Sequence, residues 1–203
     1  MKLAIVGATG NIGSHVLNEA LSRGHAVTGL TRDPAKLAAR ANLTPRVADT
    51  SRTAELSQIL RGHDAVIVAV KWTENDIDKV IAAMRASGVR RCLFVVGAGS
   101  LRRQDGQLNF DYMKSLGIEP PTSKPAMHAL EVLRTVEDLD WTAISPAFAI
   151  NPGERTGTFR LGMDDMVFDD AGQSLISRED FAVAILDEIE RPRHIRSRFT
   201  VGY

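Results

Sequence analysis

Three glycines at a spacing of three residues follow the first apolar run of the chain, and they constrain its fold most strongly. Residues 3–6 are predicted to form a short buried strand, and Gly7, Gly10 and Gly13 come directly after it. An amphipathic helical pattern then begins at residue 12. Positions without a Cβ atom let the backbone turn sharply and approach a diphosphate, which the free N–H groups of the helix N-terminus attract. The sequence therefore predicts a nucleotide-binding turn; the alternative is a purely structural turn.

The rest of the chain alternates short apolar runs with amphipathic stretches, a pattern typical of repeated strand–helix–strand units. The run 64–70 is apolar enough to be buried on both faces, as parallel strands are. We therefore expect an α/β fold: a single Rossmann-like domain over residues 1–203, with a doubly wound parallel sheet and a small C-terminal lobe. The lobe, residues 147–176, is expected to be irregular, to contain two short strands and to close over a cofactor cleft.

The expected strands cover residues 3–6, 26–31, 46–48, 64–70, 92–96, 141–145 and 198–201. The expected helices run from 12 to a stop at Gly24, over 34–40, 53–60, 74–87 and 124–137, and from a capping pattern at 177–180 to at least 189. Residues 97–122 are rich in glycine, proline and polar residues, which predicts a long loop over the carboxyl edge of the sheet.

Composition excludes several classes of protein. Lys plus Arg and Asp plus Glu each number 25 among the 203 residues, so the basic surplus of a nucleic-acid-binding protein is absent. The single cysteine, Cys92, excludes an intrachain disulfide and a multi-cysteine metal site, and the histidines lack metal-ligand spacing. No run approaches the ~18 apolar residues of a membrane span, and the first apolar run is too short for a signal peptide. We expect a cytoplasmic protein with a small-molecule substrate, either monomeric or homodimeric.

The end of the second strand indicates which dinucleotide binds. Arg32 is the first charged residue after this strand, and Lys36 follows one turn later, so both could contact the 2′-phosphate of NADP. Asp33 lies about 20 residues beyond Gly13, where an acidic residue would hold the ribose of NAD. Because Pro34 follows it, we interpret Asp33 as a helix cap. NADP is therefore favoured, with NAD as the alternative.

Several segments resemble the atypical short-chain dehydrogenase/reductases that bind NAD(P)H, and within them the flavin-reductase and biliverdin reductase B-like group. These segments are GATGNIG, LTRDPAK, GVRRCLFVVGAGSL, LDWTAISPA, PGERTGTFRLG and the C-terminal DDAGQSLISREDFAVAILDEIERPRHIRSRFTVGY. The resemblance covers nearly the whole chain and is weakest over residues 104–122. It implies a diphosphate site at Gly7, Thr9, Gly10, Asn11 and Ile12. It also implies that Arg32 contacts the 2′-phosphate, that Asp49 lies by the adenine, that Ala69 and Val70 lie under the nucleotide, and that Pro146 lies near the nicotinamide.

The Tyr-x-x-x-Lys pair that usually protonates the alkoxide in short-chain dehydrogenases is missing. Leu116 stands four residues after Tyr112, and Pro120 stands four residues before Lys124. Flavins and quinones need no such acid, because solvent can protonate the reduced ring. The sequence therefore predicts an NADPH-dependent reductase of flavins, quinones or similar conjugated rings. The alternative is a non-catalytic NADP(H)-binding redox sensor, whereas an epimerase would need an acid/base pair that the chain lacks.

Candidate catalytic residues are few. Ser100 could hydrogen-bond near the nicotinamide, and Lys124 could contact the ribose; the alternatives are a turn serine and a solvated lysine at a helix start. Aromatic residues that could stack on a ring-shaped substrate or simply pack are Trp72, Phe110, Tyr112 and Phe148. Arg102 and Arg103 could attract an anionic substrate or form an ordinary surface pair, and Cys92 is expected to be buried and inert.

Overall fold

The computed structural model describes residues 1–203, and its central element is an eight-stranded sheet. The strand order is β3-β2-β1-β4-β5-β6-β10-β8, and all neighbours are parallel except β10 and β8. The order reverses between β1 and β4, which confirms the expected doubly wound α/β fold. The strands of this sheet are β1 (Lys2–Val6), β2 (Ala26–Thr31), β3 (Leu43–Val47), β4 (Ala65–Val68), β5 (Arg91–Val95), β6 (Asp140–Ser145), β8 (Arg160–Gly162) and β10 (Ser197–Gly202).

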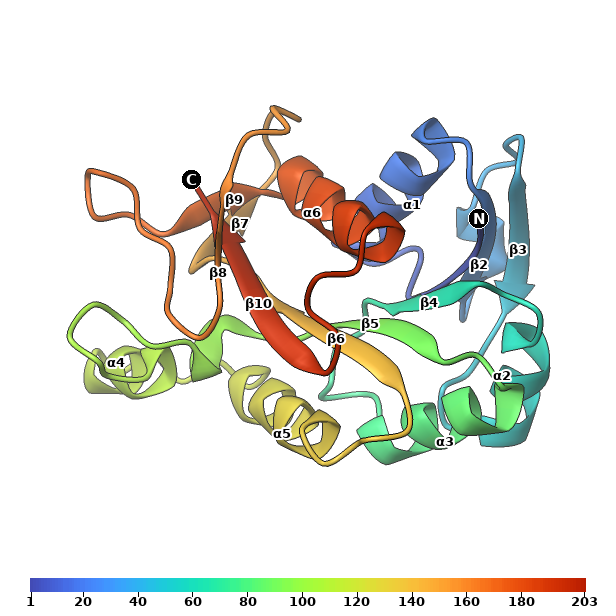
Figure 1. Ribbon diagram of the computed structural model, residues 1–203, viewed down its shortest axis with the longest axis horizontal. Helices are drawn as coiled ribbons and strands as arrows, with labels where there is room; N and C mark the ends of the chain where they lie inside the picture. Colours follow the sequence, from blue (N-terminus) through green and yellow to red (C-terminus); the bar gives the residue numbers. More distant parts are fainter.

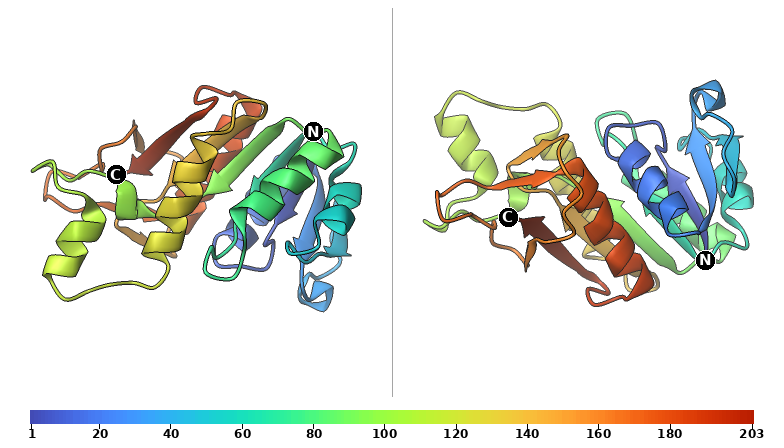
Figure 2. Two further views of the ribbon diagram at one scale, coloured as in Figure 1. Left: turned by 90° about the horizontal axis from the view of Figure 1, so that it is seen from below. Right: turned by 90° about the horizontal axis from the view of Figure 1, so that it is seen from above.

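Helices cover both faces of the sheet. Two of them lie on one face, α1 (Gly13–Ser22) and α6 (Arg178–Glu190). Three lie on the other face (Figures 1 and 2), namely α2 (Thr53–Leu60), α3 (Ile77–Ser87) and α5 (Ser123–Leu133). Each layer buries its own apolar core against the sheet.

Strand β4 shows why the sheet needs helices on both sides. All four of its residues are buried, and they alternate between the two cores. Val66 and Val68 join the core under α2, α3 and α5, whereas Ala65 and Ile67 join the core under α1 and α6. Because successive side chains of a strand point to opposite faces, a fully apolar strand is stable only when both faces are covered.

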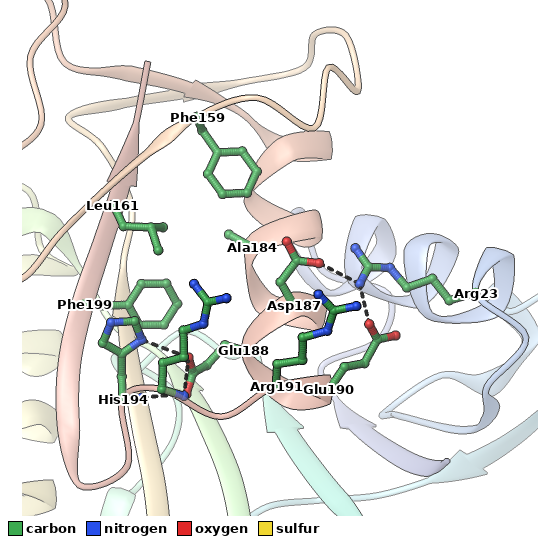
Figure 3. Close-up of a pocket in the computed structure, with 11 residues that line it drawn as sticks. Arg23, Phe159, Leu161, Ala184, Asp187, Glu188, Glu190, Arg191, His194 and Phe199 are labelled. Atoms are coloured by element: carbon green, nitrogen blue, oxygen red, sulfur yellow. Dashed lines mark hydrogen bonds and ion pairs between the residues drawn. The ribbon is translucent and has the colours of Figure 1, made fainter.

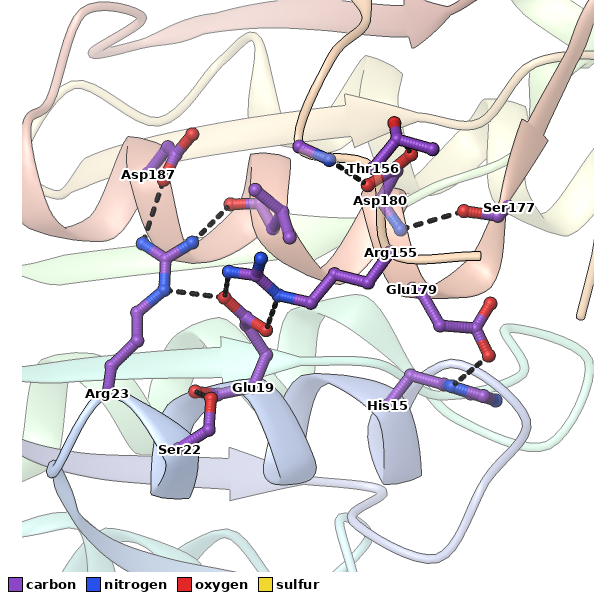
Figure 4. A network of polar contacts seen from close by, with 12 residues as sticks. His15, Glu19, Ser22, Arg23, Arg155, Thr156, Ser177, Glu179, Asp180 and Asp187 are labelled. Atoms are coloured by element: carbon purple, nitrogen blue, oxygen red, sulfur yellow. Dashed lines mark hydrogen bonds and ion pairs between the residues drawn. The ribbon is translucent and has the colours of Figure 1, made fainter. Parts of the chain in front are cut away.

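The C-terminal lobe contributes one strand to the main sheet and is hydrogen-bonded to helices α1 and α6. Its strand β8 extends the main sheet, and β7 (Ala149–Asn151) pairs with β9 (Leu175–Ser177) in a separate two-stranded sheet. Between these strands, Arg155 donates two hydrogen bonds of 2.8 Å to the carboxylate of Glu19 on α1 (Figure 4). Asp180 of α6 accepts hydrogen bonds from the Thr156 hydroxyl and the Gly157 amide. The lobe is therefore fixed against the helix that begins at the glycine turn.

One helix was missed by the sequence analysis. Residues 97–122, expected to be a loop, contain α4 (Asn109–Ser115) and the single 3₁₀ turn η2 (Ala98–Ser100). Helix α4 has two turns and no side-chain cap, so local sequence signals are weak. The burial of Phe110 and Met113 stabilises it instead.

Other boundaries differ by a few residues. The expected helix 34–40 is wrong: only the 3₁₀ turn η1 (Pro34–Lys36) forms, and Leu37 is already extended. Helix α3 begins at Ile77 rather than 74, because the side chain of Asp76 accepts hydrogen bonds from two amides of its first turn. None of the helices combines the length and apolar character needed to cross a membrane.

Candidate nucleotide site and substrate cavity

The turn after β1 can be built only with glycine at its first and last positions. Gly7 has a positive φ of 87°, and a Cβ atom there would lie 2.3 Å from the carbonyl oxygen of Ala69. At Gly13 a Cβ atom would lie 2.0 Å from the carbonyl oxygen of Gly7. Both distances are far below van der Waals contact, so the turn packs against β4 and against itself too closely for any side chain. The requirement for glycine at positions 7 and 13 therefore has a direct steric cause.

The same turn exposes a row of unused backbone donors. The amides of Thr9, Asn11, Ile12 and Gly13 donate no hydrogen bond to another group of the protein. The Thr9 hydroxyl lies 2.8 Å from the Thr31 hydroxyl, which fixes the turn to the end of β2. Free amides at a helix N-terminus, at the point where the strand order reverses, form a site that fits a diphosphate.

The residues predicted to contact the adenosine end lie at the carboxyl ends of β2 and β3. Asp33 caps η1 by accepting a hydrogen bond from the Ala35 amide, as interpreted from the sequence. The Lys36 ammonium lies 3.8 Å from the Asp33 carboxylate. Arg32 projects into solvent with its side chain 81% exposed, and its Nη2 lies 3.1 Å from Oε2 of Glu74, in the β4–α3 loop. Both cations are therefore accessible to an anion.

Asp49 follows β3 and is exposed. Its carboxylate accepts a hydrogen bond of 2.8 Å from the Ser51 amide. Hydrogen bonding from Ser51 lowers the pKa of Asp49, and the nearby positive charges of Arg52 and Arg32 act in the same direction. Asp49 is therefore an ionised hydrogen-bond acceptor on the side of the sheet where the adenosine would lie.

A cavity of about 450 Å³ opens at the carboxyl ends of β4, β5 and β6. Most of its 19 lining residues are apolar. Val70 and Pro146, both expected beside the cofactor, lie in its wall. So do the stacking candidates Trp72 and Phe148. Helix α4 and the loop after it contribute Asn109, Met113 and Ile118, which sequence analysis did not single out because it expected a featureless loop there.

The cavity contains almost no group that can exchange a proton. Lys71, which is exposed, is the one titratable residue in its wall. The ring of Tyr112 lies under the guanidinium of Arg103, 3.6 Å from its carbon, and the Tyr203 hydroxyl donates to Asp180. Neither tyrosine lines the cavity, which agrees with the missing Tyr-x-x-x-Lys pair.

Neither predicted catalytic residue lies in the cavity wall. Ser100 is in η2, where its hydroxyl accepts a hydrogen bond of 3.2 Å from Arg198. Arg198 also donates to Ser145 and to Asp164, so this serine belongs to a structural network. Lys124 is 67% exposed and forms an ion pair of 2.6 Å with Glu119. Both residues therefore lie outside the cavity wall, and their side chains are engaged by Arg198 of β10 and by Glu119 in the loop before α5.

The remaining candidates have structural roles. Phe110, a residue of α4, is buried and does not line the cavity. Arg103 stacks on Tyr112 rather than standing free for an anionic substrate. Cys92 is fully buried in β5, as expected, and burial raises the pKa of its thiol to about 12.

A second cavity, of about 280 Å³, lies at the far end of α1 from the glycine turn, between α6, β8 and β10 (Figure 3). Its carboxylates already have partners. Arg23 binds Asp187 and Glu190 at 2.8 and 2.9 Å, and Glu188 accepts a hydrogen bond from His194. This cavity is therefore held together by internal ion pairs and is remote from the nucleotide site.

Comparison with known proteins agrees with this geometry. Residues 7–192 match the sequence model of a family described as NAD(P)H-binding. The chain belongs to this family. YwnB of Bacillus subtilis (strain 168) is 33% identical over 213 residues, which covers 99% of this chain and 98% of YwnB. The protein is therefore an NAD(P)H-binding, atypical short-chain dehydrogenase/reductase-like protein.

Two solved structures of similar chains carry names that suggest different chemistry. A putative epimerase from Bacteroides thetaiotaomicron is 40% identical, with a TM-score of 0.89 over 100% of this chain and 96% of that one. A putative NADH-flavin reductase from Streptococcus pneumoniae TIGR4 is 30% identical, with a TM-score of 0.82 over 100% and 99%. Together with the family, they indicate an NAD(P)-dependent oxidoreductase. The chemistry of the cavity residues is then the basis for choosing between epimerisation and flavin reduction.

Proposed function

We propose that this protein is an NADPH-dependent reductase that transfers hydride to a flavin, a quinone or a similar conjugated ring. The observation that carries the proposal is the apolar cavity beside the glycine turn, whose wall holds aromatic side chains but no tyrosine, histidine or carboxylate. Such a wall suits a flat ring, which needs contact area and orientation rather than proton chemistry.

Each part of the site has a task in this reaction. The free amides of Thr9, Asn11 and Ile12 would hold the diphosphate. When bound, NADPH supplies the hydride. Trp72, whose indole N–H donates a hydrogen bond of 2.8 Å to the Val95 carbonyl, is held rigidly in the cavity wall, while the exposed Phe148 can stack on the ring. Solvent at the open cavity mouth can protonate the reduced ring.

The cavity favours reduction over epimerisation. Epimerisation through an oxidised intermediate requires a group that removes a proton from an alcohol and returns it. Lys71 is the only titratable residue in the wall, and it is exposed to solvent, so the wall holds no pair of groups that could take and return this proton. An electron-poor ring makes no such demand, so the reductase fits the residues present.

NADPH is proposed as the preferred coenzyme over NADH. Arg32 and Lys36 are the exposed cations at the end of β2, and Asp33 is engaged as a helix cap rather than free to hold a ribose. A guanidinium forms strong charge-assisted hydrogen bonds with phosphate oxygens.

The test is a steady-state assay of NADPH oxidation with FMN, riboflavin and menadione as acceptors. We expect turnover with at least one of them. Phe148→Ala should raise the KM for the acceptor about 3- to 10-fold, the equivalent of one lost aromatic contact. Leu161→Ala, a comparably exposed apolar residue outside this cavity, should not change it. Tight NADPH binding without oxidation by any acceptor would refute the reductase and favour the redox sensor.

A further inference from the structure

Asn109, the first residue of α4, stands out among the residues of the cavity wall. It is 1% exposed, and it lines the 450 Å³ cavity. Its side-chain nitrogen Nδ2 has no hydrogen-bond partner. The only other buried side-chain nitrogen or oxygen without a partner is Nε of Arg91, a residue that forms an ion pair with Glu188 and does not line this cavity.

The surroundings of Asn109 determine which end of its amide is free. Nη1 of Arg103 donates to Oδ1 of Asn109 at 3.4 Å. The Arg103 guanidinium lies 3.6 Å from the centre of the Tyr112 ring and 5.5 Å from that of Phe168. An arginine held between two aromatic rings keeps its donors in a fixed place. The amide oxygen is thereby occupied, and the two N–H donors of Nδ2 remain.

A buried donor without an acceptor destabilises the folded protein, and such groups are rare. The fixed orientation of the Asn109 amide and the unused N–H groups of its Nδ2 are both explained if a ligand in the cavity supplies the missing acceptor. The apolar neighbours Met113, Ile118 and Trp72 would cover the rest of a ring.

We propose that Nδ2 of Asn109 donates a hydrogen bond to a ring carbonyl of the substrate, with Arg103 as the residue that positions the amide. This inference rests on the proposed reductase function and narrows it. The preferred acceptors are conjugated rings that carry a carbonyl, as quinones and the flavin ring do, rather than carbonyl-free aromatic rings of the same size.

The test compares 1,4-naphthoquinone as substrate with naphthalene as a competitive inhibitor. Asn109→Leu removes the donor at similar volume, and Asn109→Asp keeps an acceptor for Arg103 while removing the donor. Both variants should raise the KM for naphthoquinone about 3- to 10-fold, the effect of one neutral hydrogen bond. The inhibition constant of naphthalene should stay within about twofold for Asn109→Leu. Asn18→Leu, an exposed asparagine on α1, is the matched control and should behave as wild type.

The outcomes separate the two proposals. If the wild type reduces naphthoquinone and both Asn109 variants keep its KM, the role of Asn109 is refuted while the reductase stands. Equal losses for naphthoquinone and naphthalene in Asn109→Leu would show a packing role and also refute it. A wild type that neither binds nor reduces naphthoquinone refutes the role of Asn109, and one that also reduces none of FMN, riboflavin and menadione overturns both proposals.

Discussion

Coenzyme preference can be tested through a pair of residues whose replacement should act in opposite directions. Arg32 lies at the end of β2 with its side chain 81% exposed, and it is held 3.1 Å from the carboxylate of Glu74. A 2′-phosphate arriving at this position would compete with Glu74 for the guanidinium. Arg32→Ala should therefore weaken NADPH binding, and Glu74→Gln should strengthen it.

The magnitudes follow from the exposure of the pair. A hydrogen bond to a charged group contributes about 1.5–3 kcal/mol, and an exposed ion pair about 0.2–1 kcal/mol. Because Arg32 must leave Glu74 to bind a phosphate, the net contribution is about 1–2 kcal/mol, or roughly 5- to 30-fold in the Kd of NADPH. Glu74→Gln should tighten NADPH binding by about 1.5- to 5-fold.

Calorimetric titration of each variant with NADPH and NADH measures these effects. The Kd of NADH should stay within about twofold in Arg32→Ala, because no phosphate stands at its ribose. Glu74→Gln should have no effect once Arg32 has been removed. The preference for NADPH should also decrease as salt is added, since charges this exposed are screened beyond about 8 Å at physiological ionic strength. An unchanged NADPH-to-NADH ratio in Arg32→Ala would show that Arg32 does not select the phosphorylated coenzyme.

Three further predictions concern the glycine turn, the lobe contact and the buried thiol. Gly13→Ala places a Cβ atom 2.0 Å from the Gly7 carbonyl oxygen, so it should lower the Tm and abolish calorimetric NADPH binding; wild-type affinity would contradict the steric argument. The hydrogen bond from Arg155 holds the pKa of Glu19 below its usual value. This carboxylate therefore stabilises the fold above its unfolded-state pKa and loses that contribution as the pH falls through its lowered folded-state value. Glu19→Gln should cost about 1–3 kcal/mol at neutral pH and progressively less in acid, and a pH-independent difference in Tm would refute the linkage. Cys92, with its pKa raised to about 12, should resist iodoacetamide in the native protein and react after denaturation, whereas native labelling would require local opening of β5.

The sequence predicts the structure best where the structural requirement is local. The apolar runs predict every strand of the main sheet to within a few residues, with the exception of β8. Strand β8 has only three residues and lies in an otherwise irregular lobe. Strand β3 was expected at 46–48 but spans Leu43–Val47, since Pro45 weakens the strand signal and is tolerated only because β3 is an edge strand. Helix α4 was missed because tertiary burial of Phe110 and Met113, rather than capping or periodicity, stabilises it.

The sequence by itself determined the doubly wound frame and the tight glycine turn after β1. Apolar periodicity and the absence of a Cβ atom at Gly7 and Gly13 act within a few residues of chain, so they can be read without coordinates. Only the tertiary structure decided which side chains meet in the cavity. Asn109 lies in the wall, whereas Ser100 and Lys124 lie outside it. Contacts with Arg103, Arg198 and Glu119, respectively, orient these three side chains. These contacts depend on how the loops fold over the sheet, which cannot be read from the sequence.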